Sequence, residues 1–357
     1  GDWFVDRRKL PHGLSELAKE IHKRGMKFGL WFEPEMISTD SGLFRKHPDY
    51  VLHTEGRPYT IGRGQLVLDL SRKDVCDYVI KSVSDVLKST KIDYVKWDMN
   101  RHLTDAGSVV FSADQQGEIM HRYVLGLYRI MEEITEEFPD ILFESCSSGG
   151  GRFDPGMLYF APQTWTSDDT DAAEREKIQY GTSFVYPIVS MGSHVSAVPN
   201  HQLHRTTPLS TRANVAYFGT FGYELDLNLL SAKEIEEVKA QVEFMKEHRD
   251  LIQVEGDFYR ILSPFEGNDT AWMVVSRDKK QAVAGYYERL NKVNASWMRL
   301  RFKGLDEDQL YRVKWEDKCL KAYGNELMYA GIPVDRDYCN KTNGDFHSVL
   351  YTIEAED

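Results

Sequence analysis

The segment from Tyr94 to Arg101 reads Tyr-Val-Lys-Trp-Asp-Met-Asn-Arg and places an amine, a carboxylate and an amide at alternate positions. Alternate residues of a β-strand share a face, so a strand here would present Lys96, Asp98 and Asn100 together. A cationic neighbour and an amide donor keep a carboxylate ionised and oriented. The nucleophile of a retaining glycosidase requires this environment. The alternative is the polar end of a strand with one incidental ion pair.

Carboxylic acids are crowded after Trp165, in the sequence Trp-Thr-Ser-Asp-Asp-Thr-Asp. Crowded carboxylates raise one another's pKa, which keeps one of them protonated long enough to act as a general acid. Asp168, Asp169 and Asp171 therefore form the second candidate catalytic group. The alternative is the first turn of a helix, where acidic side chains are stabilised by the helix dipole. Asp171 fits that alternative.

Cys146 begins a glycine-rich segment, Cys-Ser-Ser-Gly-Gly-Gly-Arg. Its spacing differs from the phosphate-binding pattern G-x-x-x-x-G-K-[ST], and the sequence offers no basis for pairing this cysteine with a catalytic histidine. A loop whose backbone approaches a small ligand is the better interpretation, with an ordinary turn as the alternative.

An aromatic and two acidic residues share one face of a predicted strand upstream, at Trp31, Glu33 and Glu35. Aromatic rings line many concave binding sites, so Trp31 could stack on a sugar ring. The alternative places Trp31 in the hydrophobic core.

These groups occur where short apolar runs alternate with helical patterns, up to about residue 250. A long helix is expected at about 115–137. A capping pair at Ser71 and Asp74 and a capping box at Ser231 and Glu234 predict the starts of two further helices. Strands are expected at 27–32, 92–97, 141–146, 163–167, 187–191 and 223–227, with an ambiguous run at 65–70. This alternation predicts a parallel sheet.

Polar clusters end several of these strands, at 31–35, 96–100, 144–146 and 166–169, as at the active face of a (β/α)₈ barrel. A nucleotide-binding Rossmann sheet would instead carry G-x-G-x-x-G, which the sequence lacks. The sequence therefore predicts a (β/α)₈ TIM barrel over residues 1–252. Because only six strands are evident and the chain begins with Gly, we expect the first strands to lie upstream.

A different pattern begins at about residue 253, where apolar and charged residues alternate with a period of two. Tyr311, Val313 and Trp315, for example, alternate with Arg312 and Lys314. This periodicity is typical of antiparallel strands with one buried face. The sequence therefore predicts a C-terminal antiparallel β-sandwich domain over residues 253–357.

The 357-residue chain has a net charge of −12 and contains 41% hydrophobic residues. An acidic chain without a basic cluster argues against nucleic acid and membranes as partners. No apolar run reaches the length of a membrane-spanning helix. The cysteines are too few and too scattered for a disulfide framework, which favours a reduced, cytoplasmic setting. They are Cys76, Cys146, Cys319 and Cys339.

Taken in order, the motifs resemble those of family 36 glycoside hydrolases, the bacterial α-galactosidases. They are Gly-Asp-Trp at residue 1, Trp-Phe-Glu-Pro-Glu at 31, Lys-Trp-Asp-Met-Asn-Arg at 96, Glu-Ser-Cys-Ser-Ser-Gly-Gly-Gly-Arg-Phe-Asp at 144 and Trp-Thr-Ser-Asp-Asp-Thr-Asp-Ala at 165. The resemblance runs from residue 1 to about 230 and continues as a C-terminal β-domain. The family's Asp-Asp-Gly-Trp-Phe motif, whose acids bind galactose hydroxyls, has no counterpart in this sequence.

The resemblance implies that Asp98 is a nucleophile and that Asp168 is the general acid/base. The implied sugar contacts are Trp31, Arg63, Lys96, Asn100, Cys146 and Trp165. Family members are often tetramers, so a homo-oligomer is expected by analogy. The resemblance implies no metal or other cofactor.

The implied activity is that of a retaining exo-α-galactosidase, which acts on oligosaccharides of the melibiose and raffinose type through a covalent galactosyl-enzyme intermediate. Two alternatives within the same fold are an α-N-acetylgalactosaminidase and an α-galactosyl transferase. A third is a non-catalytic carbohydrate-binding protein. The third alternative gives no reason for two acids at strand ends.

Overall fold

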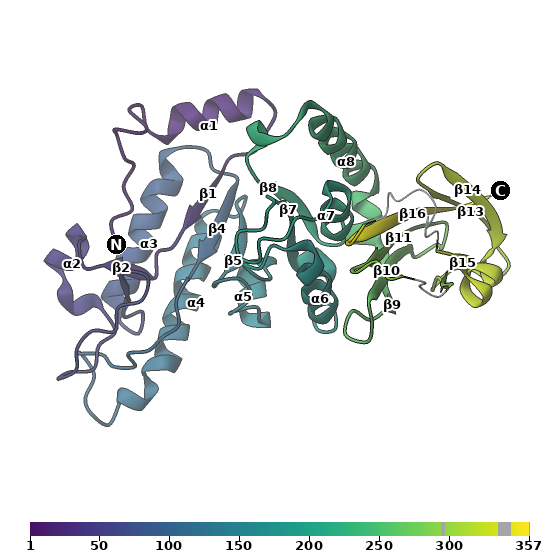
Figure 1. Cartoon of the computed structure of the whole chain (residues 1–357). Helices are drawn as coiled ribbons and strands as arrows, with labels where there is room; N and C mark the ends of the chain where they lie inside the picture. Colours follow the sequence, from purple (N-terminus) through teal and green to yellow (C-terminus); the bar gives the residue numbers. More distant parts are fainter. Residues whose placement is uncertain (294–296, 335–343, 357) are drawn as a thin grey trace. The chain divides into compact units, whose positions relative to one another are not determined.

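The structure is a computed structural model that describes residues 1–293, 297–334 and 344–356 (Figure 1). The chain forms two compact units, Gly1–Trp165 and Thr166–Asp357. Parallel strands followed by helices occur in both units, whereas the large antiparallel sheet belongs to the second. Cys76, Cys146 and Cys319 are free thiols. Cys339 lies outside the described residues.

The first unit is built on a parallel sheet in which β1, β4, β5 and β6 follow one another. The strands are β1 (Gly29–Phe32), β4 (Tyr94–Asp98), β5 (Leu142–Cys146) and β6 (Gln163–Trp165). Trp31 is in register with Lys96, and Asp98 is in register with Cys146. Polar residues that follow different strands in the sequence therefore meet at one edge of the sheet, as barrel strands require.

Helices pack their apolar residues into the hydrophobic core of this unit, and the two long ones, α3 and α4, lie side by side (Figure 1). The helices are α1 (Leu14–Lys23), α2 (Gly42–Lys46), α3 (Lys73–Ser89), α4 (Ile119–Glu137) and α5 (Pro155–Phe160). The inward face expected for the long helix is confirmed, because its apolar residues at intervals of three or four are buried. They are Ile119, Tyr123, Leu127, Ile130 and Ile134.

The ambiguous run at 65–70 forms β3 (Gln65–Val67), which pairs with β2 (Met36–Ser38) in an antiparallel ribbon separate from the parallel sheet. The capping pair expected at Ser71 and Asp74 is wrong, because each has a nearer partner. The Ser71 hydroxyl donates to Asp69, and Asp74 binds the Arg72 guanidinium. Both partners lie within two residues, and such local contacts compete with capping.

The second unit begins with another part of the strand–helix pattern, in which β7 (Met191–Ser196) pairs in parallel with β8 (Thr220–Glu224). The strand expected at 187–191 is wrong, because the backbone N–H of Ser190 bonds the carbonyl of Pro187 in a 3₁₀ turn and the strand starts only at Met191. The remaining helices of this part are α6 (Ala172–Thr182), α7 (Leu209–Ala216) and α8 (Ala232–Asp250).

The capping box predicted at the start of α8 is confirmed. The Ser231 hydroxyl accepts a hydrogen bond from the backbone N–H of Glu234 at 3.3 Å, and the Glu234 carboxylate accepts one from the backbone N–H of Ser231 at 2.8 Å. This reciprocal pair satisfies two backbone donors that a helix start leaves open. Short 3₁₀ turns occur at Pro48–Tyr50, Gln116–Glu118 and Leu227–Leu229, and π-helical turns at Leu251–Glu255 and Glu326–Ala330.

The second unit continues as antiparallel sheet, in the strand order β14, β13, β16, β11, β10, β9. The strands are β9 (Gly256–Leu262), β10 (Asp269–Ser276), β11 (Gln281–Glu288), β13 (Leu310–Trp315), β14 (Lys318–Tyr323) and β16 (His347–Ala355). A smaller ribbon, β12 (Arg299–Leu300) with β15 (Ile332–Pro333), contributes Leu300 and Ile332 to the same hydrophobic core as Tyr311 and Val313. Two layers around one core make a β-sandwich.

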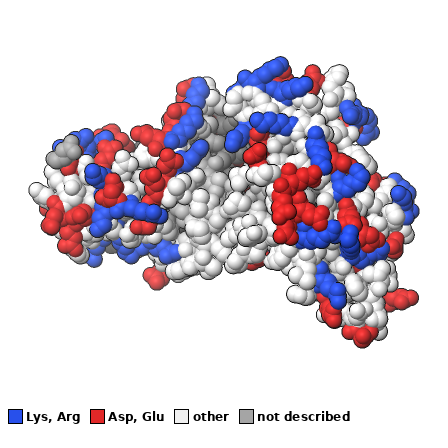
Figure 2. Space-filling view, turned by 180° about the vertical axis from the view of Figure 1, so that it is seen from behind, with Lys and Arg blue, Asp and Glu red and all other residues white. Residues whose placement is uncertain are grey.

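Where charged side chains gather on the face drawn in Figure 2, both signs lie next to one another. Helix α8 illustrates this mixture, because Lys239 pairs with Glu236 at 2.6 Å and Lys246 pairs with Glu243 at 3.0 Å. No helix within the described residues is long and apolar enough to cross a membrane. The division into domains at residues 252 and 253 stays a prediction.

Candidate active site

Asp98 ends β4, and its carboxylate accepts hydrogen bonds from several directions. The indole Nε1 of Trp31 donates to Oδ2 at 3.0 Å, and Nδ2 of Asn100 donates to the same oxygen at 2.8 Å. The backbone N–H of Met99 donates to Oδ1 at 2.9 Å. Because Asp98 is only 5% exposed, these donors from β1 and the end of β4 fix the orientation of a buried carboxylate.

Lys96 lies two residues earlier on β4 and is held by a buried acid. Its Nζ atom is 3.2 Å from Oε1 of Glu144 and 5.0 Å from the ring centre of Trp165. Glu144 also accepts hydrogen bonds from the Tyr94 hydroxyl and, at 3.4 Å, from Nε2 of Gln163. Burial, and next the charge of Glu144, raise the pKa of Tyr94 well above its ordinary value, so the phenol remains a donor. This arrangement directs an ammonium group toward the edge of the sheet that carries Asp98.

Glu33 connects two of the predicted sugar contacts, although no role was predicted for it. Its Oε1 atom accepts a hydrogen bond from Nδ2 of Asn100 at 2.6 Å and lies 3.7 Å from NH1 of Arg63. Its Oε2 atom accepts from Nε2 of Gln65 at 3.2 Å. Glu33 is 5% exposed. The sequence carries a signal for Glu33, because the expected strand places it on the same face as Trp31, two residues earlier.

Glu35 does not share that face, so this expectation is wrong. Strand β1 ends at Phe32 and a turn follows, which sends Glu35 to the side of the sheet covered by α4. There its carboxylate accepts hydrogen bonds from Nε1 of Trp97 at 2.8 Å and from the Tyr123 hydroxyl at 2.6 Å. The NH1 group of Arg152 donates to it at 2.9 Å.

Cys146 lies beside Asp98 at the end of β5 and is 2% exposed. Burial, and next the charge of Asp98, raise the pKa of its thiol well above the ordinary value. The thiol is therefore neutral near pH 7 and suits a contact better than a nucleophile. The segment after it is a tight loop, in which a Cβ atom at Gly151 would meet the carbonyl oxygen of Ser147 at 2.7 Å.

The acids of the second motif have separate roles in the structure. Asp171 caps α6, because its carboxylate accepts from the backbone N–H of Glu174 at 3.1 Å, and it also pairs with Arg205. Asp169 accepts from the backbone N–H of Asp171 at 3.1 Å, whereas Asp168 is exposed. The helix-cap interpretation of Asp171 is thus confirmed. Asp168 belongs to the second unit, and the residues around Asp98 belong to the first.

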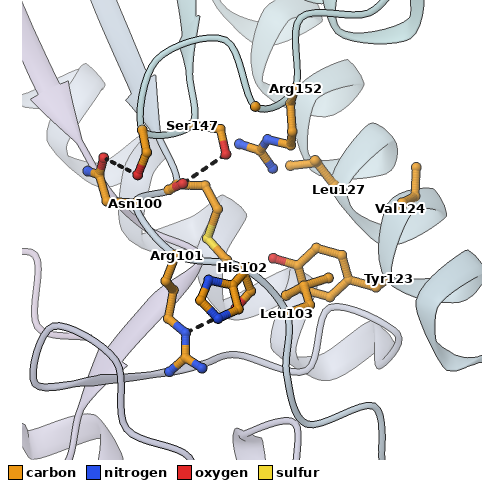
Figure 3. A pocket seen from close by; sticks show the side chains of 12 residues that line it. Asn100, Arg101, His102, Leu103, Tyr123, Val124, Leu127, Ser147 and Arg152 are labelled. Carbon is orange, nitrogen blue, oxygen red and sulfur yellow. Dashed lines mark hydrogen bonds between the residues drawn. The ribbon is translucent and has the colours of Figure 1, made fainter. Parts of the chain in front are cut away.

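A cavity of about 410 Å³ borders Asn100. The loop residues Ser147 and Arg152 form one side, and Tyr123 and Leu127 of α4 form another (Figure 3). Its size falls within the range of small-molecule pockets. Within the described ranges, no group of three or more His, Cys, Asp or Glu side chains converges as the ligands of a metal ion would.

Two family models match the chain. Residues 1–255 match the family described as Melibiase, and residues 269–353 match the family 36 C-terminal domain of glycosyl hydrolases. The chain belongs to the melibiase family. This membership confirms the resemblance drawn from the ordered motifs.

Several alpha-galactosidases are similar to this chain over nearly all of its length. Alpha-galactosidase AgaA of Geobacillus stearothermophilus is 56% identical over 356 residues, which cover 99% of this chain and 48% of that protein. Alpha-galactosidase Mel36A of Lactobacillus acidophilus is 46% identical over 357 residues, with 99% and 47% covered. The chain therefore spans about half the length of these relatives.

Solved structures of GH36 alpha-galactosidases are similar to the same extent. The crystal structure of GH36 alpha-galactosidase AgaA matches with a TM-score of 0.95 at 56% identity, covering 100% of this chain and 48% of that one. AgaA variants in complex with raffinose and with stachyose match at 55% identity, with TM-scores of 0.96 and 0.95 and the same coverage. This likeness confirms the predicted fold class, part of a (β/α)₈ barrel followed by an antiparallel β-sandwich.

Proposed function

We propose that the full-length protein is a retaining exo-α-galactosidase that removes terminal α-D-galactosyl residues from oligosaccharides such as melibiose and raffinose. The observation that carries this proposal is the set of donors on Asp98, from Trp31, Met99 and Asn100. A buried carboxylate oriented at the end of a barrel strand suits a nucleophile. Alpha-galactosidases at 46–56% identity, and the AgaA complexes with raffinose and stachyose, support the substrate class.

In the proposed mechanism, Asp98 attacks the anomeric carbon while Asp168 protonates the leaving oxygen. The carboxylate of Asp168 then removes a proton from water, and that water releases galactose from the covalent intermediate with its α-configuration retained. A retaining enzyme requires the two carboxyl groups to lie about 5–5.5 Å apart. The exposure of Asp168 supports its role, because a general acid must reach the substrate.

The proposed sugar contacts are Trp31, Arg63, Lys96, Asn100, Cys146 and Trp165. Trp31 is 47% exposed, which leaves its ring available for stacking on a sugar while its N–H binds Asp98. Arg63 is likewise exposed and Lys96 partly so, and both can donate to hydroxyl groups. Cofactors and metals have no step in this mechanism.

Hydrolysis of an aryl α-galactoside by the full-length protein tests the proposal. Initial release of α-galactose, followed by proton NMR, is the expected result, and initial release of the β-anomer would overturn the retaining mechanism. Preferential cleavage of an α-N-acetylgalactosaminide would favour the alternative of an α-N-acetylgalactosaminidase. A dominant transfer product would favour the transferase, and sugar binding without turnover would favour the binding protein.

We also propose that the full-length protein is cytoplasmic and forms a homo-oligomer, a tetramer by analogy with the family, with no nucleic acid or membrane partner. The buried free thiols Cys76 and Cys146 support a reduced setting. The negative net charge argues against polyanionic partners such as nucleic acid. Light scattering of the purified full-length protein tests the tetramer. Cell fractionation tests the compartment.

A further inference from the structure

A single carboxylate, that of Glu35, gathers donors from three distant parts of the first unit. Its Oε1 atom lies 2.8 Å from NH2 of Arg152, and Oε2 accepts from NH1 of the same guanidinium at 2.9 Å. Trp97 and Tyr123 donate to the remaining lone pairs. Glu35 has no exposed surface. Glu35 is therefore a fully buried carboxylate in a close ion pair with Arg152, whose side chain is 19% exposed, and the two residues are 117 apart in the sequence.

Stability is a weak explanation for such a pair. Removing two charges from water is costly, and well-packed apolar side chains of similar volume are often as stabilising or more so. What an ion pair supplies beyond stability is a defined geometry. Here the ion pair fixes the position of Arg152, the residue that ends the glycine-rich loop after Cys146.

The loop that Arg152 ends is in direct contact with the surroundings of Asp98. The Ser147 hydroxyl donates to the carbonyl oxygen of Met99 at 2.9 Å, and the backbone N–H of Met99 donates to the carbonyl oxygen of Cys146 at 3.1 Å. That same N–H also donates to Oδ1 of Asp98 at 2.9 Å. The position of the loop therefore decides where one donor to Asp98 lies.

The loop also touches the second donor to Asp98. The Ser148 hydroxyl lies 3.4 Å from Oδ1 of Asn100, on the opposite side of the amide from the Nδ2 group that donates to Asp98. A donor at Oδ1 favours the amide orientation that keeps Nδ2 on the carboxylate. Two donors to Asp98 thus depend on the placement of residues 147 and 148.

We propose that Arg152 is a positioning residue for the reaction. Through its ion pair with Glu35 it fixes the loop 147–151, and the loop holds the Met99 N–H and the Asn100 amide on Asp98. This inference rests on the proposed function. Loss of the pair displaces these donors, and displacements of about 1 Å in a catalytic site can cost on the order of 100-fold in rate.

The test compares R152M and R152K in the full-length protein, assayed with an aryl α-galactoside. R152M has a similar side-chain length and no charge, so we expect kcat to fall about 10- to 100-fold while KM changes less than threefold. R152K keeps a cation that can reach Glu35 but loses the planar guanidinium, so we expect kcat between those of R152M and wild type. A purely structural role would lower the folded fraction and leave kcat per folded molecule unchanged.

D93N is the matched control. It disrupts a contact between an acidic and a basic side chain at the start of β4, the strand that Asp98 ends. The Asp93 carboxylate lies 2.6 Å from Nε2 of His22 and accepts from the backbone N–H of Phe28 at 2.8 Å, just before β4. We expect D93N to lower the melting temperature without changing kcat per folded molecule. If R152M does not fold, E35Q replaces it, because glutamine keeps the shape and an acceptor and removes only the charge.

The outcomes separate this inference from the proposed function. An active wild type with R152M, or E35Q in its place, at wild-type kcat would overturn the positioning role alone. A rise in KM without a fall in kcat would also overturn it. A wild-type protein without activity on any α-galactoside would overturn the proposed function, and the positioning role with it.

Discussion

Glu33 accepts a 2.6 Å hydrogen bond from Asn100, whose Nδ2 group also donates to the candidate nucleophile. One amide nitrogen thus joins two nearly buried carboxylates, those of Glu33 and Asp98. Because Glu33 also pairs with Arg63, a change at Glu33 affects a predicted sugar contact and the environment of Asp98 together. This relationship leads to the first prediction.

We expect E33Q to lower kcat/KM of the full-length protein about 10- to 100-fold. The substitution removes a charge-assisted hydrogen bond to Asn100 and the ion pair with Arg63, and a bond of that kind is worth roughly 1.5–3 kcal/mol. Steady-state kinetics on an aryl α-galactoside measure the effect. E20Q, on the exposed surface of α1, is the control and should behave as wild type. Equal kinetics for both variants would show that Glu33 has no role at the site.

The two candidate catalytic acids should differ in their dependence on the leaving group. D98A should lose activity on every α-galactoside, because it removes the nucleophile. D168A should lose far more rate on melibiose than on a nitrophenyl galactoside, whose leaving group needs little protonation, and general acid catalysis is worth roughly 10²–10⁴-fold. Azide should partly restore D168A, because an anionic nucleophile needs no general base. If D169A shows this pattern and D168A does not, Asp169 is the acid.

The thiol of Cys146 should be a contact and chemically unreactive. C146A should weaken substrate use without abolishing turnover. Burial raises the pKa of Cys146 well above the ordinary value and that of Cys76 to about 11, so little thiolate exists at pH 8. Iodoacetamide at pH 8 should therefore label the exposed Cys319 first, as peptide mass spectrometry can measure. Labelling of Cys146 as fast as Cys319 would contradict the neutral thiol.

Stability should depend on pH through Glu176, which α6 buries against β10. Its Oε2 atom accepts from the Thr270 hydroxyl at 2.7 Å, and burial raises the pKa of Glu176 to about 7. Between the ordinary pKa of 4.5 and pH 7, the folded state binds more protons than the unfolded state, so stability falls as pH rises. The full loss above pH 7 is about 3 kcal/mol.

E176Q should remove this dependence, because glutamine can accept from Thr270 and carries no charge. We expect the variant to melt at a higher temperature than wild type at pH 8 and at nearly the same temperature at pH 5. Calorimetry at the two pH values measures the difference. A variant less stable than wild type at both would show that Glu176 is ionised and favourably paired in the folded protein.

Local patterns in the sequence were sufficient for the architecture. Intervals of three and four predicted the buried face of α4, and the pair Ser231 and Glu234 predicted the start of α8. Polar residues after successive apolar runs indicated the barrel. These features follow from contacts within a few residues or from the periodicity of a single element, and both can be read from one segment at a time.

The features that the sequence did not predict depend on long-range contacts. The amino-acid sequence was enough to predict the strand–helix order, the motif around Asp98 and the helix-cap alternative for Asp171. It did not determine that Glu35 turns away from Trp31, because that depends on β1 ending at Phe32. The pairing of Glu35 with Arg152 could not be predicted either, since partners separated by more than 100 residues depend on the register and packing of several elements at once.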